Sequence, residues 1–327
     1  MNVHPLRPAA EAPHRNPGMA FEPDWIDQIH VNLSAAERRV EQLGGRRSWK
    51  KAHQAAWLLR AISCIDLTTL AGDDTPGRVR RLCAKARNPV RLDILEALGV
   101  EHLGVTTGAV CVYHEMVETA VRALEGTNIP VAAVSTGFPA GLSPFRLRLM
   151  EIEESVAAGA REIDIVISRR HVLTGDWRAL YEEVQAFRAA CGEAHMKAIL
   201  ATGELGSMRK VAQASMAAMM AGADFIKTST GMEAVNATLP VGLVMARMIR
   251  EYQDRTGHKV GFKPAGGIRS AKVSLNWLAM MKEELGNEWV GPELFRFGAS
   301  ALLADIERQL EHFVTGRYSA LHRHALG

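Results

Sequence analysis

Two short apolar runs of this 327-residue sequence each contain a lysine whose position points to chemistry. Lys227 lies in DFIKTST (224–230), and Lys263 lies in GFKPAGG (261–267). Only a neutral amine attacks a carbonyl carbon, and a lysine of ordinary pKa, about 10.4, is neutral at pH 7 in about one molecule in a few thousand. Partial burial and a neighbouring positive charge both lower that pKa. The pair therefore predicts that Lys227 is a Schiff-base nucleophile activated by Lys263, whereas a single strand lysine would more often extend to solvent.

A carboxylate in a third apolar run fits the same chemistry. Asp164 lies in EIDIVIS (162–168) between two isoleucines, so it faces away from the side on which the isoleucines pack. A buried carboxylate normally needs a cationic partner. We expect Asp164 to approach Lys227, or to reach Lys263 through water, and to relay protons to the substrate. A purely structural ion pair is the alternative interpretation.

Other polar residues on the same inward faces are given supporting roles. Asp66 and Thr68 occur in CIDLTTL (64–70), Lys197 follows the methionine of MKAIL, and Thr230 with Gly231 ends the first lysine motif. We expect Asp66, Thr68, Thr230 and Gly231 to contribute to substrate binding. Asp66 could equally neutralise the lysines, and Lys197 could belong to a structural salt-bridge layer.

Small residues directly follow the last two strand-like runs. Gly266 and Gly267 end GFKPAGG, and Gly298 and Ser300 end FRFGAS (295–300). Small residues let backbone amides approach an anion in front of a helix N-terminus, and barrels of parallel strands commonly bind phosphate at this place. The pattern predicts a phosphate site, which Arg269 is near enough in sequence to assist.

These motifs lie in a regular alternation of strand-like and helical patterns. Eight short apolar runs are each followed by a longer amphipathic stretch, and they span 64–70, 109–114, 131–138, 162–168, 196–204, 224–230, 261–267 and 295–300. Such alternation indicates a parallel sheet covered by helices, and eight units in one series favour a closed (β/α)8 TIM barrel over an open sheet. A helical segment, RLDILEALG, is expected between the first helix and the second strand.

The expected organisation is a single catalytic domain with extensions. Residues 1–20 are rich in Pro, Ala, His and Arg without periodicity, and we expect a mobile arm there. Residues 21–61 are expected to form a helical extension, 62–315 the barrel and 316–327 a C-terminal tail.

Composition limits the other function classes. The net charge is only +3, and the basic residues are spread along the chain, so nucleic acid is not an expected partner. No apolar stretch is long enough to span a bilayer, and the N-terminus lacks the apolar core of a signal peptide. The four cysteines (Cys64, Cys83, Cys111 and Cys191) form no CxxC pair, which argues against a zinc site or a disulfide framework. We expect buried thiols, a cytoplasmic location, no membrane partner and no metal.

Taken together, the motifs closely resemble those of the deoxyribose-phosphate aldolase family. The resemblance covers about Cys64 to about His312 in the expected order, and it rests on CIDLTTL, EIDIVI, ATGEL, DFIKTSTG, NAT, VGFKPAGGIR and RFGAS. One departure concerns Met232, because many members have lysine at that position, where it helps to hold phosphate. Another concerns the C-terminus, since some members end in a tyrosine and this chain ends in HRHALG.

The resemblance implies reversible cleavage of 2-deoxy-D-ribose 5-phosphate to D-glyceraldehyde 3-phosphate and acetaldehyde, in deoxyribonucleotide catabolism, without a cofactor. It implies that Lys227 forms the Schiff base, that Lys263 lowers its pKa and moves protons, and that Asp164 relays protons. The expected partner is a small phosphosugar, and a homo-oligomer is compatible with the sequence. The alternatives are another class I aldolase or transaldolase acting on a phosphosugar, and a non-catalytic barrel that only binds sugar phosphates.

Overall fold

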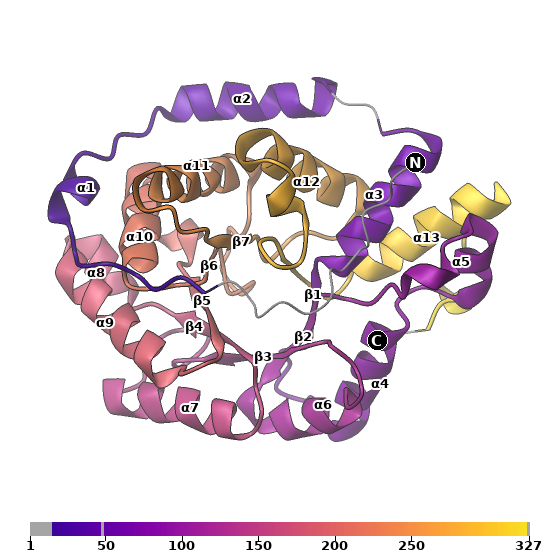
Figure 1. Ribbon diagram of the computed structural model, residues 1–327, viewed down its shortest axis with the longest axis horizontal. Coiled ribbons are helices and arrows are strands. Elements are labelled where there is room, and N and C mark those ends of the chain that lie inside the picture. The colour runs from indigo at the N-terminus through magenta and orange to yellow at the C-terminus, as the bar shows by residue number, and fades with distance from the viewer. Residues whose placement is uncertain (1–14, 47–48, 326–327) are drawn as a thin grey trace.

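The computed structural model describes residues 15–46 and 49–325, and within them eight parallel strands form a barrel surrounded by helices (Figure 1). The strand order is β7-β6-β5-β4-β3-β2-β1-β8. Parallel bridges from Phe262 to Phe295 and from Ala265 to Gly298 bring β7 and the β8 region together. The strands are β1 (Ile65–Thr68), β2 (Ala109–Tyr113), β3 (Val131–Ser135), β4 (Glu162–Val166), β5 (His195–Ile199), β6 (Phe225–Lys227), β7 (Gly261–Lys263) and β8 (Phe297–Ala299). All eight expected strand runs are confirmed, and so is the barrel.

Helices of the repeating units form the outer layer. They are α4 (Pro76–Arg87), α6 (Val117–Ala123), α7 (Phe145–Ala157), α9 (Trp177–Ala190), α10 (Met208–Met220), α11 (Leu239–Thr256), α12 (Ala271–Leu285) and α13 (Leu302–Thr315). Shorter insertions are α5 (Leu92–Leu98), which is the segment expected before the second strand, and α8 (Arg169–Thr174). Single turns of 3₁₀ helix are η1 (Glu101–Leu103), η2 (His114–Met116), η3 (Thr202–Glu204), η4 (Asn287–Val290) and η5 (Leu321–Arg323).

Several helices begin where the sequence supplies a side-chain acceptor. Thr75 accepts from the backbone amide of Arg78 at the start of α4, with Pro76 as the first helical residue. Ser207 and Ser270 cap α10 and α12 in the same way. These hydroxyls accept hydrogen bonds from first-turn amides, which have no acceptor within the helix. Proline fits the first helical position because an N–H there would also lack an acceptor within the helix.

The N-terminal extension packs on the outside of the barrel. It contains α1 (Pro23–Asp27), α2 (Leu33–Arg46) and α3 (Lys51–Ser63). Helix α2 lies along α11 and α12, whereas α3 contacts α12 and α13 (Figure 1). The residues before α1 are also packed: Asn16 is 1% exposed, and its side-chain amide donates to the carbonyls of Met219 and Ala223. Residues 15–20 of the expected arm are therefore bound to the barrel, and 1–14 lie outside the described residues.

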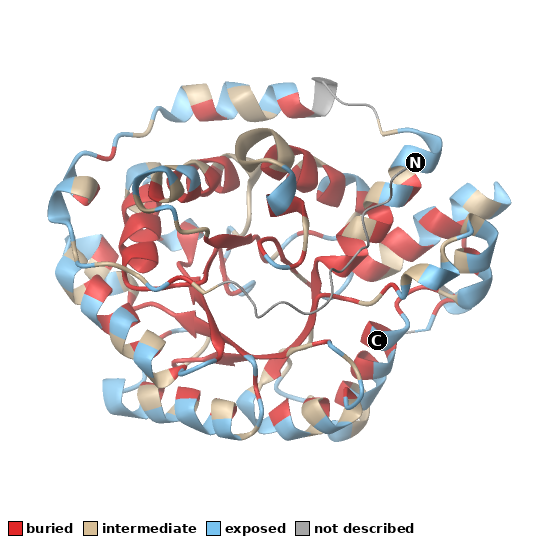
Figure 2. Ribbon diagram, in the orientation of Figure 1, coloured by how far each residue is buried: buried red, intermediate tan, exposed pale blue. Residues whose placement is uncertain are grey.

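Side chains alternate between two faces along each strand. Val110, Val112, Ile163 and Ile165 pack outward in the main apolar core, between the sheet and the helices. The strands and the inner faces of the helices are buried, and exposed residues lie on the outer faces (Figure 2). Every second residue must then face the barrel interior, where charged residues of β1, β4, β5, β6 and β7 come together.

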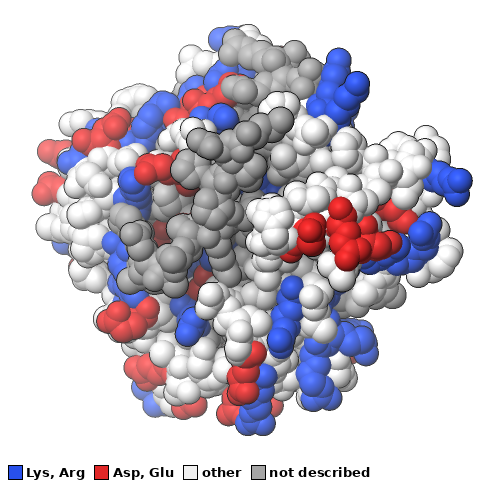
Figure 3. All heavy atoms as spheres, turned by 45° about the vertical axis from the view of Figure 1, so that its right-hand side comes forward, with Lys and Arg blue, Asp and Glu red and all other residues white. Residues whose placement is uncertain are grey.

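Charged residues of both signs lie close to one another on the face shown in Figure 3. No helix among the described residues is long and apolar enough to cross a membrane.

Candidate active site

Seven charged side chains meet inside the barrel, and we call them the barrel network. Each is at most 6% exposed. They come from β1, β4, β5, β6, β7 and the residue before β8, and they are Asp66, Glu162, Asp164, Lys197, Lys227, Lys263 and Arg296. So many ionised groups are tolerated away from water only when each has partners of opposite charge.

Asp164 is the hub of the barrel network. Its Oδ2 accepts hydrogen bonds from Lys227 Nζ at 2.7 Å and Lys263 Nζ at 2.8 Å, and its Oδ1 accepts from Lys197 Nζ at 3.1 Å. Lys227 and Lys263 are direct neighbours in the β6–β7 register. Burial raises the pKa of Asp164, but the three ammonium groups outweigh it and hold that pKa well below its usual range. Asp164 is therefore ionised and touches both lysines directly, without an intervening water.

The lysines of the network differ in protonation. Burial lowers the pKa of Lys227, and the positive charge of Lys263 lowers it further, against the opposing effect of Asp164. Burial also acts on Lys197 and Lys263, but their carboxylate neighbours outweigh it and raise the pKa of both above the ordinary value. Of the three lysines, Lys227 is thus the one that loses its proton most readily.

The base of the network is built on Arg296. Its guanidinium donates to Asp66 Oδ1 at 2.7 Å and to Glu162 Oε1 at 2.9 Å. Lys263 donates to the other oxygen of Asp66, and Lys197 donates to Glu162. Sequence reasoning missed Glu162 and Arg296. Glu162 had a usable signal, because it lies two residues before Asp164 on the same face of the strand.

A cavity of about 370 Å³ opens above the network, at the carboxyl-terminal ends of the strands. Lys227 and Arg269 are the charged residues among the described residues that line it. Seven of the eight expected substrate-binding residues also line it: Thr68, Thr230, Gly231, Gly266, Gly267, Gly298 and Ser300. Asp66 does not, and its contacts are with Lys263 and Arg296. Asp164 and Lys263 also lie outside the lining, and they reach the reaction space through Lys227.

The rim of this cavity depends on backbone conformation. Gly267 has a φ of +79°, which favours glycine, and a Cβ there would extend into open space. Gly298 is needed for a different reason, because a Cβ would approach Ala265 Cβ at 2.8 Å and Lys263 Cε at 3.3 Å. The backbone amides of Thr230 and Gly231 donate to the Glu233 carboxylate. Those two amides are therefore occupied, which leaves the turns after β7 and β8 as the better anion site.

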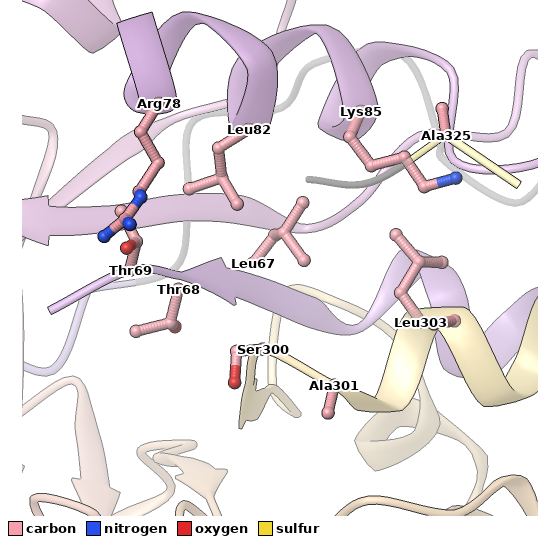
Figure 4. A pocket seen from close by; sticks show the side chains of 11 residues that line it. Leu67, Thr68, Thr69, Arg78, Leu82, Lys85, Ser300, Ala301, Leu303 and Ala325 are labelled. Atoms are coloured by element: carbon pink, nitrogen blue, oxygen red, sulfur yellow. The ribbon is translucent and has the colours of Figure 1, made fainter. Parts of the chain in front are cut away.

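A second cavity, of about 420 Å³, lies between β1, α4 and α13 (Figure 4). Leu67, Leu82 and Leu303 line its apolar part. Its two cations are already paired, Arg78 with Asp73 at 2.9 Å and Lys85 with Glu307 at 2.6 Å. Although this cavity is larger, it contains no amine placed to react, so the chemistry is assigned to the cavity above Lys227.

Among the described residues, no three histidine, cysteine or carboxylate side chains are grouped so that they could hold a metal ion. The four cysteines are buried and free. The expectation of a reaction without a cofactor stays a prediction.

The fold and the site together define a closed parallel barrel with a buried lysine amine at a cavity over the carboxyl ends of its strands. Residues 60–308 match the model of the DeoC/LacD family aldolases, and the chain belongs to this family. It is 62% identical over 307 residues to deoxyribose-phosphate aldolase of Bos taurus, covering 93% of this chain and 96% of the relative. It is 60% identical over 309 residues to deoxyribose-phosphate aldolase of Homo sapiens, covering 94% of this chain and 97% of the relative. The tetrameric deoxyribose phosphate aldolase of Aeropyrum pernix has the same fold, with a TM-score of 0.58 and 22% identity. The match covers 86% of this chain and 99% of that structure.

Proposed function

We propose that this chain cleaves 2-deoxy-D-ribose 5-phosphate reversibly to D-glyceraldehyde 3-phosphate and acetaldehyde, through a Schiff base on Lys227. The observation that carries the proposal is that Lys227 lines the cavity and is the network lysine whose pKa is lowered. Family membership supports the aldolase chemistry, and the relatives with 60% identity or more support the substrate.

The reaction starts when the neutral amine of Lys227 attacks the aldehyde carbon of the open-chain sugar. The resulting carbinolamine loses water and becomes a protonated imine. The bond between the second and third sugar carbons then breaks, because the imine accepts its electron pair. The hydroxyl on the third carbon gives up its proton, and that carbon leaves as the aldehyde of glyceraldehyde 3-phosphate. Protonation of the remaining enamine and addition of water release acetaldehyde and regenerate the amine.

Asp164 and Lys263 are proposed to move the protons of this cycle. Asp164 Oδ2 accepts from both Lys227 and Lys263, so a proton can pass between the lysines through a single oxygen atom. Asp164 has a low pKa and Lys263 a high one, so at rest the first is an acceptor and the second a donor. Before it donates a proton, Lys263 also keeps a positive charge next to Lys227.

The phosphate is proposed to bind at the turns after β7 and β8. Gly266, Gly267, Gly298 and Ser300 line that side of the cavity, and Arg269 supplies positive charge. Helix α13 begins at Leu302, so its N-terminus faces the same place. Thr68 ends β1, the strand beside β8, and Thr230 follows β6, the strand beside β7; both line the cavity, where their hydroxyls can contact sugar oxygens.

Trapping of the intermediate tests the proposal. The full chain is incubated with acetaldehyde and cyanoborohydride, digested and examined by peptide mass spectrometry. We expect a reduced two-carbon adduct on Lys227. Lys210, a half-buried lysine that donates to the Leu173 carbonyl, serves as the internal control for nonspecific alkylation. Absence of the adduct, or equal labelling of Lys227 and Lys210, contradicts the Schiff-base proposal.

The biological setting is proposed from the same chemistry. The substrate is a breakdown product of deoxyribonucleosides, which places the reaction in deoxyribonucleotide catabolism. The four buried, free cysteines support a reducing compartment such as the cytoplasm. Association of several copies of the chain stays a prediction, which a mass measurement in solution would check.

A further inference from the structure

Arg296 occupies the base of the barrel network, away from the cavity. It is 6% exposed, and it bridges Asp66 of β1 and Glu162 of β4 at 2.7 and 2.9 Å. Its Nε donates to the Pro292 carbonyl, which fixes the plane of the guanidinium. Arg296 does not line the cavity above Lys227, so any effect on the reaction must act through other residues.

The charges of the network do not balance when every group is ionised. Three carboxylates, those of Asp66, Glu162 and Asp164, face four bases, those of Lys197, Lys227, Lys263 and Arg296. An uncompensated charge in a buried site is costly, and a titratable group in that situation neutralises instead. One of the four bases is therefore expected to lack its proton.

The contacts decide which base releases its proton. Arginine remains protonated at any physiological pH. Lys263 contacts both Asp66 and Asp164, and Lys197 contacts both Glu162 and Asp164. Lys227 contacts Asp164, through an oxygen that it shares with Lys263. Lys227 therefore has the least carboxylate contact to stabilise its protonated form, and it is the lysine of the network that lines the cavity.

We propose that Arg296 is a positioning residue that keeps Lys227 unprotonated from the far side of the network. It supplies the fourth positive charge and occupies one oxygen of Asp66 and both oxygens of Glu162. This inference rests on the proposed Schiff-base role of Lys227. Without the guanidinium, three bases would balance three carboxylates, and Lys227 would keep its proton as a partner of Asp164.

Other ionisable groups beside the network do not change this count. Burial raises the pKa of Cys64 to about 12 and that of Cys111 to about 11, so both are neutral thiols at pH 7. Burial lowers the pKa of His195, so its imidazole is neutral. Glu293 is exposed to solvent, and Asp224 accepts from the backbone amides of Asn16 and Met196, outside the network.

The test is the pH dependence of acetaldehyde trapping at Lys227 in full-length variants. Arg296→Gln removes the charge but keeps hydrogen-bond donors. We expect it to move the midpoint of the profile up by about one pH unit, with about tenfold slower trapping at pH 7. Arg296→Lys keeps the charge, and its midpoint should stay at the wild-type value. A wild-type midpoint in Arg296→Gln overturns the proposal, whereas a wild-type chain that forms no adduct at Lys227 overturns the proposed function instead.

A double variant separates charge from structure. Arg296→Gln combined with Glu162→Gln removes one charge of each sign and restores the positive surplus, so the midpoint should return to the wild-type value. A structural role predicts that the double variant is at least as impaired as the single one, and that result overturns the proposal. If Arg296→Gln does not fold, as judged by circular dichroism, the trapping midpoint of the single variant Glu162→Gln tests the proposal. This variant should lower the midpoint, and an unchanged or higher midpoint contradicts the charge count.

Discussion

The barrel network and a second group of buried charges differ in which kind of group burial drives towards its neutral form. The second group, which we call the peripheral cluster, lies between α4, α13 and the C-terminal tail and comprises Lys85, Glu307, Glu311 and His324. Lys85 Nζ lies 2.6 Å from Glu307 Oε2, and His324 Nε2 lies 3.0 Å from Glu311 Oε2. Lys85 pairs with Glu307, and Glu311 also pairs with Arg91 and Arg323 nearer the surface, so each of these carboxylates has a cation of its own. In the barrel network, by contrast, four bases share three carboxylates.

This difference explains why only one of the two groups is suited to nucleophilic chemistry. In the peripheral cluster burial raises the pKa of Glu307, so a carboxylate is the group driven towards its neutral form. In the barrel network the group driven towards its neutral form is an amine, Lys227. Lys85 lines a cavity as well, but its ammonium is held by Glu307. Burial of a lysine beside a cavity is therefore not sufficient for the proposed reaction, and we propose that the surplus of bases is what leaves an amine without its proton.

The largest contrast is expected between Lys227→Met and Lys85→Met. Lys227→Met should lower turnover by at least about a thousandfold, because the nucleophile is lost. Its free energy of unfolding should stay the same or rise. The folded-state pKa of Lys227 lies below the unfolded value, so folding weakens proton binding at this lysine and costs stability at neutral pH, and the substitution removes that cost. Initial rates and urea unfolding measure the two effects.

Lys85→Met is the matched comparison, since it makes the same side-chain change in the other cluster. It should reduce the free energy of unfolding, by roughly 3 kcal/mol as for other buried pairs broken on one side, because Glu307 loses its ammonium partner. Turnover should remain within about twofold of wild type, the scale of a substitution that leaves transition-state contacts intact. If both variants lose activity and stability in parallel, the distinction between the two clusters is wrong.

Lys263→Met is expected to affect both properties. Turnover should fall by roughly a hundredfold or more, the usual scale for losing a proton-transfer group. The folded-state pKa of Lys263 is raised, so its contribution to stability is fully present below the unfolded value, near 10.5, and is lost only as pH rises through the folded value. The substitution should therefore also cost about 3–5 kcal/mol at pH 7, because Asp66 and Asp164 lose a buried partner.

The same measurements check this second prediction, with the trapping profile added. Lys263→Met removes one base, so Lys227 should retain its proton and its trapping midpoint should rise. A variant with normal turnover and an unchanged midpoint would remove Lys263 from the mechanism and leave it as a structural ion pair.

The sequence predicted the fold and the centre of the site because both depend on local patterns. Alternating apolar residues define β4, and the same alternation directs Asp164 inward. The lysine motifs fall in register across β6 and β7, as expected for neighbouring strands. Those inferences need only strand periodicity and the order of strands around a barrel.

The remaining parts depend on contacts between distant segments. Arg296 meets Glu162 across 134 positions of sequence, and nothing in the local pattern of FRFGAS distinguishes it from an arginine that extends to solvent. Asn16 was assigned to an arm for the same reason, although it is buried against α10 and the loop that follows it. The imbalance of charge that distinguishes the barrel network is a property of the assembled group, so it could not be counted before all seven members were known.

The smallest expected effect concerns the rim of the cavity at Met232. This side chain lines the cavity and is 57% exposed, and the family resemblance implies a lysine at this position in many members. Met232→Lys would place an ammonium near the proposed phosphate site. Exposed ion pairs contribute about 0.2–1 kcal/mol, so the KM for 2-deoxy-D-ribose 5-phosphate should fall by at most about fivefold, and the gain should shrink at high salt. The KM for unphosphorylated 2-deoxyribose should not change, because that substrate carries no anion.

Met232→Gln is the control for this change, since it has similar length without charge and should leave both KM values as they are. The comparison with the barrel network makes the result informative. A charge added at the exposed rim is screened by water, so it should alter substrate affinity without moving the trapping midpoint of Lys227. An unchanged KM for the phosphorylated substrate would mean that Arg269 and the turns after β7 and β8 already satisfy the phosphate. A shifted midpoint would mean that a charge at the exposed rim reaches Lys227, and that water does not screen the two from each other.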